Sequence, residues 1–267
     1  MMSPIGNYLA VQAVSPGIMA LSEKPLVDPP IGEVRIRVEA CGVCHSDAGT
    51  VEGSFPIDWP RVPGHEAVGR IDMVGDGVNG WKVGDRVGIG FLGGSCGYCI
   101  ACRDGNLVGC RNQQYTGVHR DGGYAEFLIA KASGLMSIPQ ELSSVAAAPL
   151  LCAGLTTFSA LRNSPARPSD LVAVIGVGGL GHLAVQYGRY FGFEVIAIDL
   201  GDDRADLAKR LGAHHYVDST AADVADALRG LGGASVVLAA ASGGNTVEQA
   251  IKGLRPGGTL IALGGNS

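Results

Sequence analysis

The pattern of hydrophobic and polar positions changes near the middle of this chain. From the N-terminus to about Leu150, apolar runs of strand length alternate with Gly, Pro and Asp, and almost no stretch has helical period over a useful length. The strands predicted in this half are Val34–Val38, Ala67–Val74, Arg86–Ile89 and Ala125–Ile129. We therefore expect the first half to be an irregular β-barrel.

After Cys152, strands and helices alternate instead. Leu155–Arg162 is predicted to be helical, and Asn163–Asp170 has the composition of a turn. The strands that follow are predicted at Leu171–Val177, Glu194–Leu200, His215–Asp218, Ser235–Ala241 and Thr259–Gly264, with helices at Gly181–Phe191, Arg204–Leu211, Ala221–Arg229 and Thr246–Leu254. Such alternation indicates a parallel, doubly wound sheet. The predicted fold class is therefore α/β with a β-rich N-terminal domain, and we place the domains at residues 1–154 and 155–267.

Length, composition and charge narrow the class of protein. The 267 residues suffice for two domains at about 150 residues each. A net charge of -5 and the lack of any Lys/Arg cluster argue against nucleic acid or an anionic membrane as a partner. No apolar run reaches the roughly 18 residues of a membrane helix, and the N-terminus lacks the pattern of a secretory signal. Seven cysteines, an odd number with metal-like spacing, favour a reducing cytoplasm.

Four cysteines lie close together in a Gly-rich stretch. Cys96, Cys99, Cys102 and Cys110 have the spacing Cys-x2-Cys-x2-Cys-x7-Cys. Zinc binds four thiolates tetrahedrally, and this stretch has too little apolar surface to fold without a metal. We therefore predict a structural zinc site in a lobe at residues 93–112. The alternative, disulfides or unligated thiols, suits these short spacings less well.

A glycine-rich loop follows the apolar run LVAVI and opens a predicted helix. In that context the pattern G-x-G-x-x-G predicts a dinucleotide site, because glycines allow a tight turn, close approach of the pyrophosphate and close helix–strand packing. The helix N-terminus adds free N–H groups for the phosphates. The cofactor-binding residues predicted in this loop are Gly176, Gly178, Gly179, Leu180 and Gly181. A plain turn between strand and helix is the alternative.

Asp199 ends the next predicted strand, 18 residues beyond Gly181. Its carboxylate is placed to accept hydrogen bonds from the ribose hydroxyls of adenosine. A 2′-phosphate would be repelled by this carboxylate and by Asp202 and Asp203 nearby. The sequence therefore favours NAD over NADP, unless Asp199 is only a helix cap or a turn residue.

Several motifs occur in order along the chain: CGVCHSD, VPGHEAVG, the four-cysteine lobe, DGGYAEF, APLLCAGLTTF and VIGVGGLG. This series resembles the zinc-dependent medium-chain alcohol dehydrogenases and covers essentially the whole chain. The resemblance implies a GroES-like catalytic barrel followed by a Rossmann domain. It also implies two zinc ions per chain and transfer of a hydride between a primary or secondary alcohol and NAD, giving an aldehyde or ketone and NADH.

The resemblance assigns catalytic roles to residues in three of these motifs. Cys44, His65 and Cys152 match the ligands of the catalytic zinc, which leave one position open to water or alcohol. Glu66 matches a carboxylate beside the metal, and Asp47 matches the group that binds the far nitrogen of the histidine. Ordinary surface salt bridges are the alternative for these two carboxylates.

The resemblance also assigns a proton acceptor and two coenzyme contacts. Ser46 matches the hydroxyl that takes the alcohol proton. Many family members pass this proton on through a histidine three residues later, but Gly49 stands there, so we expect the relay to end at the ribose and water. His45 matches a contact to the coenzyme pyrophosphate, and Thr156 matches a position near the nicotinamide.

The chain stops soon after the fifth predicted strand, whereas family members continue with a further strand and a return segment. We therefore expect a fragment or a shortened relative, with an exposed fifth-strand edge and an exposed apolar patch on the catalytic domain.

Trp59 and Phe91 match positions that narrow the substrate pocket, which favours a small or medium apolar alcohol, or they are core residues. Family habit suggests a homodimer or homotetramer. A sibling polyol or formaldehyde dehydrogenase, and a non-catalytic zinc and nucleotide-binding module, stay open as alternatives.

Overall fold

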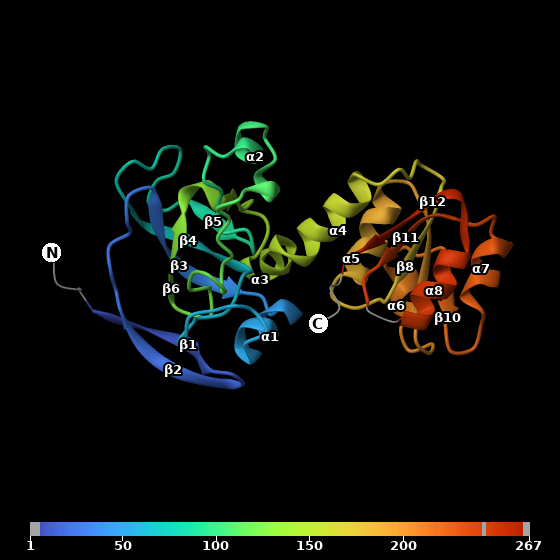
Figure 1. Ribbon diagram of the computed structural model, residues 1–267, viewed down its shortest axis with the longest axis horizontal. Helices are drawn as coiled ribbons and strands as arrows, with labels where there is room; N and C mark the ends of the chain where they lie inside the picture. Colours follow the sequence, from blue (N-terminus) through green and yellow to red (C-terminus); the bar gives the residue numbers. More distant parts are fainter. Residues whose placement is uncertain (1–5, 242–243, 264–267) are drawn as a thin grey trace. The chain divides into compact units, whose positions relative to one another are not determined.

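The computed structural model describes residues 6–241 and 244–263, which divide into two units (Figure 1). The units meet in the chain between Cys152 and Ala153. The boundary expected from the sequence, after residue 154, comes two residues later, in the first turn of α4 (Ala153–Arg162). Gly264, the last residue of the fifth predicted strand, lies outside the described residues.

An antiparallel sheet with the order β6–β3–β4–β5–β7 forms the centre of the first unit. The strands described in this unit are β1 (Asn7–Ser15), β2 (Ile18–Pro25), β3 (Glu33–Cys41), β4 (Ala67–Val74), β5 (Arg86–Ile89), β6 (Phe127–Lys131) and β7 (Leu135–Ser137). The helices are α1 (His45–Glu52), α2 (Ile100–Arg103) and α3 (Ser144–Ala147), with 3-10 turns η1 (Leu107–Gly109), η2 (Ala132–Gly134) and η3 (Ala148–Leu151).

The alternation of side chains along β3 gives this sheet its buried face. Val34 and Ile36 are buried, whereas the arginine after each of them is more exposed, because successive residues of a strand point to opposite faces. In β4 the first three residues, 67–69, are all buried. The chain that enters β4 is therefore enclosed by protein on its way into the sheet.

The apolar pattern did not predict the hairpin of β1 and β2. Its turn contains Gly17 at φ 75°, a left-handed conformation that suits glycine. The hairpin joins the rest of the unit through an antiparallel bridge between Ala10 and Ala125. Large apolar side chains that it leaves exposed are Leu9, Ile18, Met19 and Leu21.

Helix α1 is also absent from the pattern-based prediction. Its eight residues, HSDAGTVE, are mostly polar or small and so lack a helical stripe of apolar positions. The helix begins after Cys44, where the Asp47 carboxylate accepts the Cys44 N–H in a capping box. It ends at Gly53, whose φ of 79° is left-handed. Local caps therefore define this helix.

The second unit is a parallel sheet with helices on both faces, as the sequence predicts. The strand order is β10–β9–β8–β11–β12. The strands are β8 (Leu171–Ile175), β9 (Glu194–Asp199), β10 (His215–Asp218), β11 (Ala234–Ala239) and β12 (Leu254–Ala262), and the further helices are α5 (Gly181–Tyr190), α6 (Ala205–Arg210), α7 (Val224–Gly230) and α8 (Gly244–Lys252).

Two hydrophobic clusters cover the two faces of this parallel sheet. One cluster packs alternate residues of β8 and β9 against α4, α5 and α6, and the other packs the intervening residues against α7 and α8. The doubly wound arrangement is therefore confirmed. Among the described strands, β10 and β12 stand at the two edges.

None of the described helices is by itself long and apolar enough to cross a membrane. The segments Ser144–Leu151 and Ala153–Arg162 meet the criteria of length and composition only as a pair broken at Cys152. Their buried residues include Leu151 and Leu161, which belong to hydrophobic clusters of the protein.

Candidate metal centres and nucleotide loop

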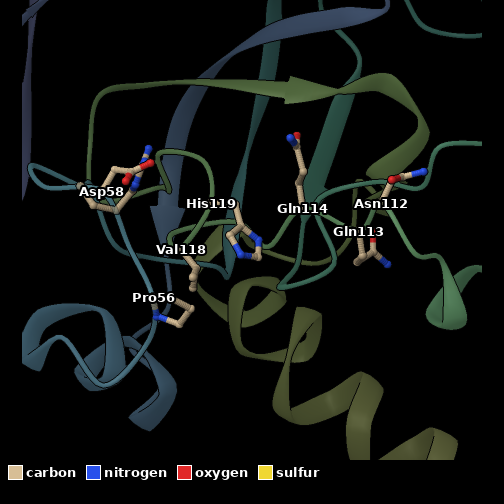
Figure 2. Close-up of a pocket in the computed structure, with 8 residues that line it drawn as sticks. Pro56, Asp58, Asn112, Gln113, Gln114, Val118 and His119 are labelled. Carbon is tan, nitrogen blue, oxygen red and sulfur yellow. The ribbon is translucent and has the colours of Figure 1, made fainter.

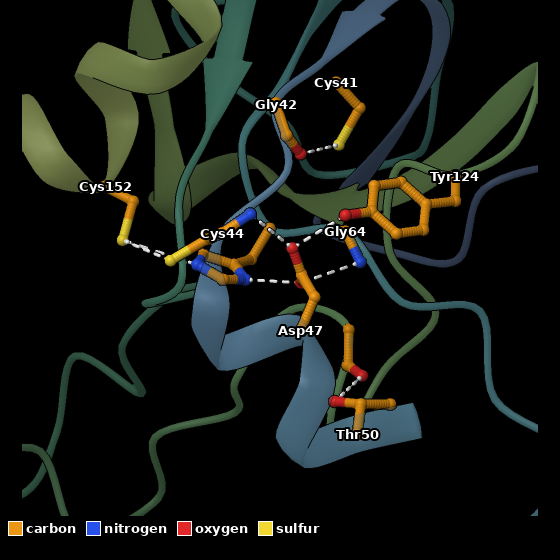
Figure 3. A network of polar contacts seen from close by, with 10 residues as sticks. Cys41, Gly42, Cys44, Asp47, Thr50, Gly64, Tyr124 and Cys152 are labelled. Carbon is orange, nitrogen blue, oxygen red and sulfur yellow. Dashed lines mark hydrogen bonds and ion pairs between the residues drawn. The ribbon is translucent and has the colours of Figure 1, made fainter. Parts of the chain in front are cut away.

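Three residues from distant parts of the chain come together in the first unit. Cys44 stands at the start of α1, His65 precedes β4, and Cys152 follows η3. The Cys44 and Cys152 sulfurs are 3.8 Å apart, and His65 Nε2 lies 3.3 Å from the Cys152 sulfur (Figure 3). A carboxylate oxygen of Glu66 completes the group, in which all ligand atoms lie within 4.8 Å of one another. This set can surround one metal ion.

The backbone around His65 forces the imidazole into the protein. Gly64 has φ 95°, a turn conformation that few other residues adopt, and the run from Val62 to Gly69 is buried throughout. His65 itself is only 1 % exposed. The neighbouring Glu66 carboxylate packs against Gly42, where an added side-chain carbon would lie 1.9 Å from its oxygen. Gly64 therefore turns the chain just before His65, and Gly42 makes room for the Glu66 carboxylate.

Asp47 orients the His65 ring, as the sequence predicts. Its Oδ1 lies 2.8 Å from His65 Nδ1 and accepts the Gly64 N–H at 3.1 Å, while Oδ2 accepts the Cys44 N–H and the Tyr124 hydroxyl at 3.0 and 2.8 Å (Figure 3). Asp47 is 5 % exposed, so these contacts replace water. Because the Nδ1–H group donates to Asp47, Nε2 faces the cysteine sulfurs, and its lone pair is available to a metal once its proton is lost. The surface salt-bridge interpretation of Asp47 is therefore wrong.

The titration of this group shows how closely its members are coupled. A hydrogen bond from the Cys152 thiol, assisted by His65, lowers the pKa of Cys44 to about 4. The Cys44 sulfur in turn raises the pKa of Cys152. Burial alone would lower the pKa of His65, but Asp47 and Cys44 raise it to about 9. Two sulfurs and an imidazole nitrogen are the donors that Zn²⁺ prefers, and a divalent cation would replace the protons that they share.

The four cysteines of the lobe also converge. Their sulfurs lie within 4.8 Å of one another, with 3.5 Å between Cys99 and Cys102 and 3.9 Å between Cys96 and Cys102. These distances are too long for disulfides, and all seven cysteines of the chain are free. The Asn112 side chain lowers the pKa of Cys96 to about 6, and burial raises the pKa of Cys102 to about 11. Four thiols with no open position fit a closed, structural metal site.

The glycine loop connects β8 to α5. Gly176 has φ 84°, and a side-chain carbon at Gly181 would lie 1.6 Å from the Gly176 carbonyl oxygen, so only glycine fits at Gly181. Gly178 and Gly179 are exposed and have open space where side chains would project. Leu180 directly precedes the first residue of α5. The loop therefore leaves backbone N–H groups accessible at a helix N-terminus, as phosphate binding requires.

Asp199 lies beside this loop at the end of β9. Its Oδ2 accepts the Val177 N–H at 2.8 Å and faces Arg204 at 3.2 Å, while Oδ1 accepts the Leu200 N–H at 2.8 Å. The residue that caps α6 is Arg204, so the alternative of Asp199 as the cap of that helix is wrong. Asp199 therefore ties the end of β9 to the start of the glycine loop.

The other predicted coenzyme and relay residues lie on helices. His45 is exposed and Ser46 half-buried in the first turn of α1, and Thr156 is half-buried in α4. Their contacts to coenzyme and substrate stay predictions. Gly49, in α1, lies against the ring of Phe55.

The aromatic surface near the first metal centre differs in part from the expectation. Phe91 contacts the His65 ring edge to face at 5.1 Å and stacks on Tyr115 at 4.6 Å. Phe55 contacts Phe91 at 6.4 Å. Trp59 instead lies beside Gly53. The sequence motifs therefore singled out Phe91, whose place in a substrate pocket stays a prediction. They did not single out Phe55 or Tyr115, which no local pattern links to His65.

A polar hollow of about 400 Å³ is lined by residues that lie close to Phe55 and Tyr115 in the sequence. None of the predicted site residues lines it. Figure 2 shows it between the Pro56–Asp58 segment and the segment from Asn112 to His119. Its polar lining includes Asp58, Arg61, Asn112, Gln113, Gln114 and His119. The metal centres and the glycine loop, rather than this hollow, hold the groups suited to chemistry.

Comparison with known proteins gives matches along most of the chain. The family model described as alcohol dehydrogenase GroES-like domain matches residues 30–140, and the one described as zinc-binding dehydrogenase matches residues 179–267. An alcohol dehydrogenase of Geobacillus stearothermophilus is 44% identical over 245 residues, which cover 91% of this chain and 72% of that protein. Alcohol dehydrogenase patD of Aspergillus clavatus is 42% identical over 92% of this chain, which spans 63% of the length of patD.

Solved structures match along both units of the chain. A structure titled NAD-dependent alcohol dehydrogenase has a TM-score of 0.88 and 32% identity, covering 95% of this chain and 76% of that one. A zinc-binding dehydrogenase from Sinorhizobium meliloti bound to NADP has a TM-score of 0.85 and 32% identity, covering 97% of this chain and 77% of that one. The expected combination of GroES-like and Rossmann-type domains is thus confirmed.

Proposed function

Because the chain belongs to the zinc-dependent medium-chain alcohol dehydrogenase family, we propose that it interconverts primary or secondary alcohols with aldehydes or ketones, using NAD as the hydride acceptor. The observation that carries this proposal is the convergence of Cys44, His65 and Cys152. Three protein ligands leave a coordination position for substrate, as in catalytic zinc sites. The glycine loop supports the coenzyme part of the proposal.

We assign two zinc ions to each chain. One is held by Cys44 Sγ, His65 Nε2 and Cys152 Sγ, with the Glu66 carboxylate close by; the four-cysteine lobe holds the other, which is structural. A zinc ion held by these residues would supply Lewis acidity, which makes an alcohol hydroxyl easier to deprotonate. Phe91, in contact with His65, presents apolar surface to the substrate carbon chain.

The protein residues around the first site handle the proton. Oxidation of an alcohol releases a hydride to NAD and a proton to a base. The Ser46 hydroxyl would accept this proton and release its own toward water near a bound coenzyme ribose, since Gly49 offers no side chain for a further step. Asp47 keeps His65 in the tautomer that leaves Nε2 free for the metal.

We infer that NAD, not NADP, is the coenzyme. The Asp199 carboxylate stands beside the glycine loop, where it can accept hydrogen bonds from the two ribose hydroxyls and repel a 2′-phosphate. Arg204 is the basic residue nearest in the chain, and it already faces Asp199. The pairing leaves Arg204 less available to a phosphate.

Alcohol-dependent formation of NADH tests the proposed activity. We expect the wild-type chain to reduce NAD with a small apolar alcohol, and Cys44→Ser to abolish the signal because a metal ligand is lost. Cys41→Ser is the matched control, since Cys41 lies outside the ligand set and its thiol donates to the Gly42 carbonyl (Figure 3). Tight NAD binding without turnover would instead support a non-catalytic zinc and nucleotide-binding module. A panel of polyols and formaldehyde separates the sibling activities.

Assembly and location complete the proposal. Family resemblance supports a homodimer or homotetramer, which light scattering of the purified chain would test. Seven free thiols support a reducing compartment, and we place the activity in the cytoplasm. Fractionation of cells that express the chain would test this location.

A further inference from the structure

We propose that Tyr124 is a positioning residue for the first metal centre, holding Asp47 so that Asp47 holds the His65 ring. This inference rests on the proposed role of His65 as a metal ligand. Tyr124 lies 77 positions after Asp47 in the chain, and its hydroxyl donates to Asp47 Oδ2 at 2.8 Å.

Each oxygen of the Asp47 carboxylate has two polar contacts. Oδ1 serves His65 and the Gly64 N–H, and Oδ2 serves the Cys44 N–H and the Tyr124 hydroxyl. Without the hydroxyl, Oδ2 keeps one donor, and rotation of the carboxylate is opposed by one hydrogen bond fewer. A looser Asp47 orients His65 less well, because the 2.8 Å contact to Nδ1 is what sets the direction of the ring.

The backbone delivers Tyr124 to this place. The Gly122 N–H bonds the Val62 carbonyl at 2.7 Å, and the Tyr124 N–H bonds the Pro63 carbonyl at 3.1 Å. The segment that carries the tyrosine therefore pairs with the segment that leads into His65. This pairing fixes the distance between the tyrosine and the histidine.

A glycine keeps open the space that the tyrosine ring fills. A side-chain carbon at Gly64 would lie 2.5 Å from Cδ1 of Tyr124, closer than any real contact allows. The ring thus crosses over Gly64, the residue directly before His65, to reach Asp47. Ring and hydroxyl have separable effects, since phenylalanine would keep the packing over Gly64 and lose only the hydrogen bond.

Burial keeps the hydroxyl protonated. Desolvation, together with the negative charge of Asp47, raises the pKa of Tyr124 above its ordinary value. The hydroxyl therefore stays protonated at neutral pH and donates to Asp47. A group that could only accept hydrogen bonds at the position of this hydroxyl would repel the Asp47 carboxylate.

Zinc retention in Tyr124→Phe tests the proposal. We would dialyse wild type and variant against graded chelator and measure zinc per chain, with the four-cysteine lobe as an internal reference. We expect the first site of Tyr124→Phe to lose zinc at a chelator concentration about tenfold lower, by analogy with other partners of ligand residues, and the lobe to be unchanged. Tyr8→Phe is the matched control, because Tyr8 is a half-buried tyrosine of the same unit whose ring packs on Phe127.

Two further measurements separate orientation from general stability. Cobalt substituted at the first site should show shifted visible absorption bands in Tyr124→Phe but not in Tyr8→Phe, because these bands report ligand geometry. In an Asp47→Asn background, Tyr124→Phe should add little to the loss of zinc, since both act through one contact.

Several outcomes would overturn the role of Tyr124. They are equal zinc retention in Tyr124→Phe and Tyr8→Phe, an equal loss from both metal sites, and a full effect of Tyr124→Phe in the Asp47→Asn background. A different result refutes the proposed function: wild-type zinc content that Cys44→Ser does not lower, or bound zinc at the first site without alcohol turnover. The second of these leaves the role of Tyr124 intact.

Discussion

The ring of Phe55 occupies the space that a side chain at Gly49 would need. A carbon attached to Gly49 would lie 2.6 Å from Cε2 of this ring. Gly49 is the position at which many family members carry the relay histidine. The departure at Gly49 is therefore matched by a second residue, and the proton route through a histidine is closed by packing as well as by sequence.

Alanine at Gly49 should have opposite effects in two backgrounds. In the wild-type protein, we expect Gly49→Ala to lower the free energy of unfolding by about 1 to 3 kcal/mol, because the Phe55 ring must move. With Phe55→Ala present, the same change should stabilise α1 by up to about 1 kcal/mol, since alanine favours helix more than glycine. Urea unfolding of the four proteins measures both effects. The same sign in both backgrounds would show that the two residues do not compete for space.

The lobe should depend on its metal more than any other part of the first unit. Apolar residues of the lobe such as Tyr98, Ile100 and Val108 are exposed, so burial contributes little to its folding. We expect Cys99→Ser to remove one zinc per chain and to make residues 93–112 sensitive to protease, while Cys44→Ser removes one zinc without that sensitivity. Elemental analysis and limited proteolysis measure both. A resistant lobe in zinc-free Cys99→Ser would contradict the structural role.

Replacing Asp199 should weaken the preference for NAD. Asp199→Asn loses the charge that repels a 2′-phosphate and weakens the hydrogen bonds to ribose, so the ratio of NAD to NADP affinity should fall about tenfold or more. Asp202→Asn is the control, because Asp202 is an exposed carboxylate close by in the chain. Binding of both coenzymes by calorimetry gives the ratio. Equal ratios for the two variants would mean that general charge, not Asp199, selects the coenzyme.

Asp170 should make the second unit sensitive to acid. The Arg167 N–H, together with Arg255 at 2.9 Å and Ser235 at 3.0 Å, lowers the pKa of Asp170. Because the pKa of Asp170 is lower in the folded state, the ionised carboxylate stabilises the fold at pH values above the ordinary pKa of an aspartate. This stabilisation is lost as the pH falls through the pKa of the folded state. Asp170→Asn should therefore lower stability at neutral pH, and the difference from wild type should shrink in acid.

Chemical unfolding at a series of pH values measures this dependence. Asp226→Asn serves as the control, since Asp226 forms an exposed pair with Arg229 that should contribute little at any pH. A constant difference between wild type and Asp170→Asn across the acid range would contradict the assignment.

The features that were predictable from sequence are those whose parts lie close together in the chain. The four cysteines span 15 positions and the glycine loop six, so spacing alone indicates their chemistry. Cys44, His65 and Cys152 converge only through tertiary folding, and they were found by resemblance to a family.

What the sequence did not predict depends on contacts between distant or weakly patterned residues. Tyr124 stands in the recognised motif DGGYAEF, yet nothing local shows that its hydroxyl reaches Asp47. Helix α1 has caps at Cys44 and Gly53 but no apolar stripe, so a search for periodicity passes over it. The hairpin of β1 and β2 has Pro-Gly at residues 16–17, a dipeptide typical of turns. This local signal indicates the turn, although the apolar pattern does not predict the two strands.

The Asp47 carboxylate caps α1 and grips the His65 ring at the same time. Formation of the helix and orientation of the His65 ring are consequently coupled through Asp47. Each favours the other by the same factor. Removal of a metal ion from this site should therefore first speed up amide hydrogen exchange in the opening turn of α1, while β4 stays protected. A metal bound at this site would therefore stabilise a helix that has caps at both ends but no apolar stripe.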